Sequence, residues 1–175
     1  MSPSVRGGES GRGQTTQDFV IGISVFLLVV VFVLAFVPGI FDPFEETNRT
    51  QTVDRYGATL ASDVLGDPST PATLNATCTW HFFRQMQTGT DTTAACRFDD
   101  GTDTVAATLG SDRLDVNVTV VDDGAVVSLN APDGVGGSAR ELRAGPPVPS
   151  RGSVVTTRRV VLLEGQTRQL VVRAW

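Results

Sequence analysis

A run of 23 uncharged residues near the N-terminus, Phe19 to Phe41, constrains the fold of this chain more than any other feature. Asp18 and Asp42 flank it directly. As an α-helix the run rises about 35 Å, enough to cross the roughly 30 Å hydrocarbon core of a bilayer. A helix packed in a soluble core keeps a polar face, and this run has none. The run therefore predicts a single transmembrane helix.

The charges on either side of the run predict its orientation. Arg6 and Arg12 precede it, whereas Asp42 and Glu45 follow it. The positive-inside rule then places the N-terminus in the cytoplasm and residues 42–175 outside the cell. The expected location is the cell membrane, crossed once.

An ordinary secretory signal is the first alternative to a permanent anchor. The apolar stretch of such a signal has about 7–15 residues and ends in an A-x-A-like cleavage site. Here the stretch is longer, and Val37-Pro38-Gly39 follows in place of such a site. We therefore expect the helix to remain as an anchor in membrane lipid.

The charged residues are unusual in kind. All 14 basic residues are Arg, Asp outnumbers Glu, and the net charge is −5. An acidic, lysine-free composition of this kind is typical of proteins from salt-adapted, high-GC organisms. It also argues against nucleic acid as a partner, because there is no basic patch to replace phosphate counterions.

The residues before the run carry a more specific pattern, Gly11-Arg12-Gly13-Gln14-Thr15-Thr16-Gln17-Asp18-Phe19. It resembles the class III signal peptide of archaeal type IV pilin-like proteins. That family has a short basic leader, cleavage before a Gln and an acidic residue at the fifth mature position. Here cleavage falls between Gly13 and Gln14, and Asp18 takes the fifth position, with Asp in place of the more usual Glu. The resemblance covers residues 11–41.

The resemblance implies the partners of this segment. They are a prepilin peptidase that cuts on the cytoplasmic side, and other pilin-like subunits, whose N-terminal amine pairs with Asp18. A carboxylate at the start of a helix is favoured by the helix dipole, although deeper burial in lipid costs several kcal/mol unless the charge is paired. The alternative is a plain anchor in which Asp18 stays at the water interface.

The chain as a whole predicts an α+β fold. A leader (1–13) is followed by a transmembrane helix (14–41), a membrane-proximal helix (42–67) and an extracellular β-rich domain (68–175). Apolar residues of the membrane-proximal helix recur at helical spacing, and Pro68 stops the pattern. These residues are Val53, Tyr56, Leu60 and Val64.

Strand patterns follow from Pro68 onward. Apolar residues alternate with polar ones between Leu114 and Val120, which predicts a half-buried strand that turns at Asp122-Asp123-Gly124. Residues 130–152 are rich in Gly and Pro and predict a loop. Val154–Leu163 and Thr167–Val172 then predict a hairpin around Glu164-Gly165-Gln166.

Cys78 and Cys96, the two cysteines, both lie in the part of the chain expected outside the cell, where disulfides persist. A disulfide between them closes a loop of about 19 residues, worth roughly 3 kcal/mol in the chain-entropy model. Free thiols are the alternative. A zinc site is disfavoured, because two Cys and His81 do not supply four ligands at a known spacing.

Three of the four asparagines lie in N-x-Thr sequons, at Asn48, Asn75 and Asn117. Sequons on exported surfaces are possible glycosylation sites. Asn117 occupies the polar face of its expected strand, so we expect it to be reachable. The alternative is that a Thr-rich composition produces the sequons by chance.

The sequence contains no complete catalytic or cofactor-binding motif, so a non-enzymatic protein is expected. The aromatic run Trp80-His81-Phe82-Phe83 is more typical of a core than of a site. Gly134–Ala139 matches G-x-G-x-x-A by letter, but too few residues follow for the required helix. Asp99–Asp103 lacks the spacing of a calcium loop and predicts a turn.

The expected function is therefore that of a membrane-anchored surface protein, a type IV pilin-like subunit of a filament or secretion-type assembly. The alternative is a monomeric membrane-anchored binding or cell-envelope module. An extracellular enzyme is a third and more distant possibility.

Overall fold

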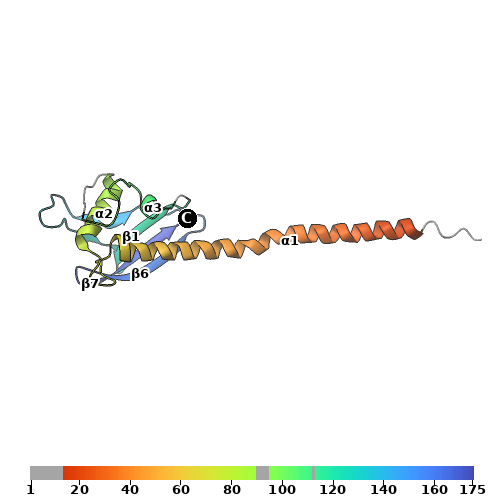
Figure 1. The fold of residues 1–175 in the computed structure, drawn as a ribbon, viewed down its shortest axis with the longest axis horizontal. Coiled ribbons are helices and arrows are strands. Elements are labelled where there is room, and N and C mark those ends of the chain that lie inside the picture. The colour runs from red at the N-terminus through yellow and green to blue at the C-terminus, as the bar shows by residue number, and fades with distance from the viewer. Residues whose placement is uncertain (1–13, 90–94, 112) are drawn as a thin grey trace, which may run out of the picture. The chain divides into compact units, whose positions relative to one another are not determined.

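The computed structural model describes residues 14–89, 95–111 and 113–175, without the side chains of 14–16 and 37–47. The chain forms two compact units, Met1–Glu46 and Thr47–Trp175. Helix α1, Gln14–Thr59, contains the whole apolar run and supplies the first residues of the second unit. Figure 1 shows that the remaining helices and all of the described strands belong to the second unit.

The second unit is built on an antiparallel sheet in the order β2-β1-β7-β6, with β5 also paired to β1. The strands are β1 (Val116–Asp122), β2 (Ala125–Val126), β5 (Arg143–Ala144), β6 (Val155–Leu163) and β7 (Gln166–Ala174). Strands β3 (Ser128–Leu129) and β4 (Arg140–Glu141) form a separate antiparallel pair. The region 130–152, predicted as a loop, contains the two short strands β4 and β5.

Two-residue turns set the register of both main hairpins. Asp123 and Gly124 join β1 to β2, and Glu164 and Gly165 join β6 to β7. All four have positive φ, between 47° and 86°. Positive φ at both central residues is the type I′ turn, whose twist matches that of paired strands. Both turns predicted from the sequence are confirmed.

One face of the sheet carries the hydrophobic core. The register aligns three buried valines of β1 with buried residues of β7, as in the pairs Val118–Val172 and Val120–Leu170. The segment that follows the apolar run packs in the same core through the predicted residues Val53 and Tyr56 of α1, and through Leu60 and Val64 of the π-helical turn η1 (Leu60–Val64). The apolar period of that segment correctly predicted its buried side.

The last turns of α1 lie close against β6. A Cβ atom on Gly57 would come 2.7 Å from Cγ2 of Thr157, so a larger residue does not fit without a shift. One turn earlier, Asp54 accepts hydrogen bonds from Thr157 and Arg159, the latter at 3.0 Å. After η1, the hydroxyl and amide of Ser69 bond to Asp67 and hold the pKa of its carboxyl below the ordinary value.

Helix α2, Ala76–Thr88, corrects the expectation that the chain is β from Pro68 onward. Asn75 caps the helix by accepting a hydrogen bond from the amide of Cys78 at 3.0 Å, and Gly89 ends it in the left-handed conformation. The aromatic run faces the core, where Trp80 and Phe83 are fully buried. A short helix, α3 (Val105–Thr108), is capped in the same way by Thr104.

The prediction that β1 is half-buried is wrong. Residues 116–120 are buried on both faces. The core covers one face, and on the other Asn117 is 4% exposed and Thr119 is 5% exposed. The Nδ2 of Asn117 donates to the carbonyl of Pro146 at 2.9 Å, so the buried amide is satisfied by a segment distant in sequence. The fold class itself, α+β with helices packed on an antiparallel sheet, is confirmed.

Candidate functional site

The apolar segment is the first candidate site. Within α1, Gln17–Phe36 is long and apolar enough to cross a membrane, by length and composition. Its described large apolar side chains other than Val30 are exposed, from 44% at Ile23 to 69% at Leu28. Ser24 satisfies its hydroxyl inside the helix by donating to the carbonyl of Val20 at 2.7 Å. A segment with these properties is consistent with a membrane anchor or a signal sequence.

The predicted processing and assembly residues lie at the start of this segment. Gly13 lies outside the described residues, and the side chain of Gln14 is not described. Asp18 is exposed in α1, four residues after Gln14. A carboxylate in the first turns of a helix lies at the positive end of its dipole. Cleavage before Gln14 and pairing of Asp18 stay predictions.

The disulfide predicted between Cys78 and Cys96 is present, with the two Cα atoms 5.5 Å apart. It ties the segment after residue 95 to the first turn of α2. A second contact holds the same segment two turns further along α2, where Nε2 of Gln85 donates to the carbonyls of Asp99 and Thr102. Disulfides are typical of domains on the extracytoplasmic side of a membrane.

The asparagines of the three sequons differ in burial and in hydrogen bonding. Asn48 is exposed, and Asn75 is half-buried at the start of α2. Asn75 uses its Oδ1 in the cap, so its Nδ2, the atom that carries a glycan, takes no part in that bond. Asn117 is the opposite case, because its Nδ2 donates to Pro146 in a buried position. The expectation that Asn117 is reachable is therefore wrong, and the cause is burial of both faces of β1.

We expect glycan at Asn48 or Asn75 in native material and none at Asn117. A sugar would replace one hydrogen of Nδ2 at a side chain that is 4% exposed beside Pro146, where there is no room for it without disturbing the buried hydrogen bond. Glycopeptide mapping of protein from its host, with coverage of all three sequons, measures this. Glycan at Asn117 in folded protein would contradict the buried environment, and unmodified peptides at all three sites would favour chance sequons.

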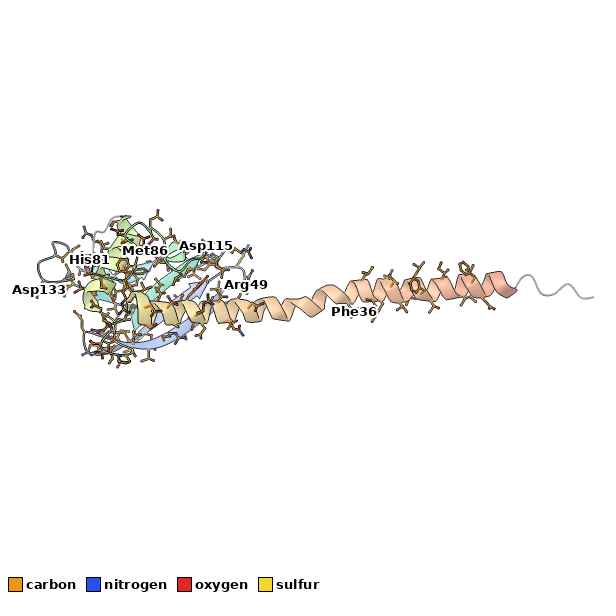
Figure 2. The ribbon with its side chains drawn as sticks, viewed as in Figure 1. Phe36, Arg49, His81, Met86, Asp115 and Asp133 are labelled. Atoms are coloured by element: carbon orange, nitrogen blue, oxygen red, sulfur yellow. A yellow bond between two sulfur atoms is a disulfide. The ribbon has the colours of Figure 1, made fainter. Side chains whose placement is uncertain are left out.

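The aromatic run at His81 and the Asp99–Asp103 turn have structural contacts in the described part of the chain. His81 is 6% exposed and contacts the ring of Trp80 edge-on, on the helix labelled in Figure 2 by His81 and Met86. Asp99 accepts a hydrogen bond from the amide of Gly101 at 2.8 Å, which forms the predicted turn. In the described ranges no three His, Cys, Asp or Glu side chains are grouped to hold a metal ion.

A polar cluster at the end of α2 is the feature that sequence reasoning missed. Gln87 accepts a hydrogen bond from Nη1 of Arg140 at 2.6 Å and donates to the carbonyls of Glu141 and Arg143. These partners are 53 to 56 residues away in sequence. A long separation between a glutamine and two arginines leaves no local pattern, so no motif predicts it.

Comparison with known proteins finds one family. No curated protein and no solved structure matches the chain. A model of a family of unknown function, DUF7287, matches residues 10–175, which include the apolar helix, the disulfide and the entire sheet. The chain therefore belongs to the DUF7287 family.

Proposed function

We propose that this protein is a membrane-anchored surface subunit of the type IV pilin-like kind, which a prepilin peptidase processes before Gln14 and which joins a filament or secretion-type assembly. The observation that carries the proposal is the organisation of α1. Its N-terminal part is the apolar segment, and its last turns supply Val53 and Tyr56 to the core of a β-rich domain. An apolar helix that runs on into a β-rich domain is the arrangement expected of a pilin-like subunit, and it supports the proposal; any domain with an N-terminal anchor helix would share it.

Three further features support this proposal. The leader contains Arg6 and Arg12, which favour retention of residues 1–13 in the cytoplasm. The disulfide is suited to a domain on the outer side. Asp18 lies in the first turns of the helix, where a carboxylate can meet a neighbour's amine without entering the centre of the bilayer.

Replacing Gly13 tests the processing step. We expect Gly13→Val to block cleavage, because the peptidase must place a side chain where glycine has none. The variant should then migrate as a longer membrane protein than the wild type in the native host, by about the mass of a 13-residue leader. Ser4→Ala in the same leader is the control and should be processed normally. Equal mobility of Gly13→Val and wild type would contradict the proposal and favour a monomeric membrane-anchored module.

A further inference from the structure

The polar cluster at the end of α2 borders a hollow of about 430 Å³ on the surface of the second unit. Its lining is polar and comes from α2 and from the β4–β5 segment. The lining residues are Gln87, Ser138, Ala139, Arg140, Glu141 and Arg143. Two of the six are arginines, in a chain whose net charge is −5. With Glu141 also in the lining, the formal charge of the hollow is +1 (two Arg and one Glu), opposite in sign to that of the whole chain.

Arg140 is held in place before any ligand arrives. Its guanidinium lies over the ring of Trp80, with Cζ 5.6 Å from the ring centroid, and its Nη1 donates to Gln87. Gln87 is itself fixed by its two bonds to strand carbonyls. Stacking and hydrogen bonding together restrict the side chain, so little rotamer entropy is left to lose on binding.

The charge of Arg140 is not neutralised within the described residues. No carboxylate there forms an ion pair with it, and Nη1 is the one nitrogen of its guanidinium with a described acceptor. Arg84 also contacts this indole ring, with its Cζ 5.4 Å from the ring centroid. Nε of Arg140 is buried without a described acceptor, so Nη2 and the second hydrogen of Nη1 are the donors that remain for an anion. A restrained guanidinium with such donors is a favourable environment for an anion.

Arg143 lies on the rim and forms an ion pair with Glu141 at 2.9 Å. Both side chains are more than half exposed, and ion pairs of that kind contribute little to stability. An incoming oxyanion can therefore compete with Glu141 for Arg143 at small cost. Because Arg140 and Arg143 both line the hollow, a bound group with two or three oxygens can accept hydrogen bonds from both guanidinium groups.

We propose that this hollow binds an oxyanion, a carboxylate, sulfate or phosphate group, through Arg140 with Arg143 at its rim. The site is separate from the anchor and from the residues that the class III resemblance assigns. It does not depend on processing or assembly. It gives the exposed domain a means to hold an anionic molecule.

Trp80 provides a direct reporter, because its ring contacts Arg140. The other tryptophan, Trp175, pairs with Asp115 through backbone atoms alone in the described bonds, so Trp175→Phe removes its signal and keeps that pairing. The full chain with this substitution, in a non-ionic detergent, is titrated with sodium sulfate, phosphate or acetate at ionic strength held constant with NaCl. A saturable change in Trp80 fluorescence with at least one of the three is expected, and the responding salt identifies the class of oxyanion.

Substitutions separate a site from general charge effects. Arg140→Gln should raise the Kd about tenfold or more, the effect of losing charge-assisted hydrogen bonds. Arg143→Gln should weaken binding less, and it tests the rim even if Arg140→Gln disturbs folding. Arg158→Gln is the matched control, because Arg158 is an exposed residue of β6 that does not line the hollow. It should leave the Kd unchanged. Absence of saturation with all three salts, or equal weakening by Arg158→Gln, would overturn the proposal.

Discussion

Replacing both Cys78 and Cys96 by Ser should lower the free energy of unfolding by about 3 kcal/mol. The disulfide closes a loop across 18 residues of sequence, and its removal returns that conformational entropy to the unfolded chain. For a domain of this size the Tm should fall by roughly 10 °C. Thermal unfolding followed by near-UV circular dichroism, with the full chain in detergent, measures the change.

Reduction supplies the control for this prediction. A reductant should lower the Tm of the wild type toward that of the double-Ser variant and leave the variant unchanged, because the variant has no disulfide to lose. Quantitative alkylation of both cysteines in unreduced native protein, or equal Tm values for wild type and variant, would show that the disulfide does not stabilise the fold.

Loss of assembly is the second large expected effect. Under the proposed function, Asp18→Ala should be processed and inserted normally but should no longer enter high-molecular-weight assemblies. A freed amine left without its carboxylate in an apolar bundle is costly, so subunits no longer pack against one another with a fixed offset. The helices keep their apolar packing surfaces, which do not need the charge. Shear fractions and native gels of wild type and mutant, made in the native host, measure this.

Asp18→Glu is the matched control, because it keeps the carboxylate and restores the residue that is more usual at this position. It should assemble like the wild type. The Tm of the second unit should be the same in all three proteins, since Asp18 belongs to the first unit. If Asp18→Ala assembles as well as the wild type, Asp18 is an interfacial residue only. If the wild type itself forms no assemblies with its relatives co-expressed, a monomeric anchor is the better description.

Features that depend on short stretches of sequence were predictable. The apolar run and the Asp-Gly and Glu-Gly turns each follow from residue types at close spacing. The disulfide follows from two cysteines in a segment expected outside the cell. The buried side of α1 beyond the apolar run also followed from its helical period, at Val53 and Tyr56. Local chemistry and the final fold agree at these places, so the pattern alone was sufficient.

Features that depend on contacts distant in sequence were not predictable. Helix α2 was not predicted, although Asn75 and Gly89 are standard helix-boundary residues. Asn117 was expected on a solvent-exposed face of its strand, but it is buried, and the carbonyl of Pro146, 29 residues away in sequence, accepts its hydrogen bond. Arg140 and Gln87, 53 residues apart, meet for the same kind of reason. Single-sequence patterns describe one strand or helix and not what later covers it.

Mass spectrometry of the mature N-terminus, on protein from the native host, tests the pilin-like proposal most directly. The proposal predicts a chain that begins at Gln14, is shorter than the translated sequence by residues 1–13, and remains in the membrane fraction. A chain that begins at Met1 or Ser2 would contradict it and leave a plain membrane anchor.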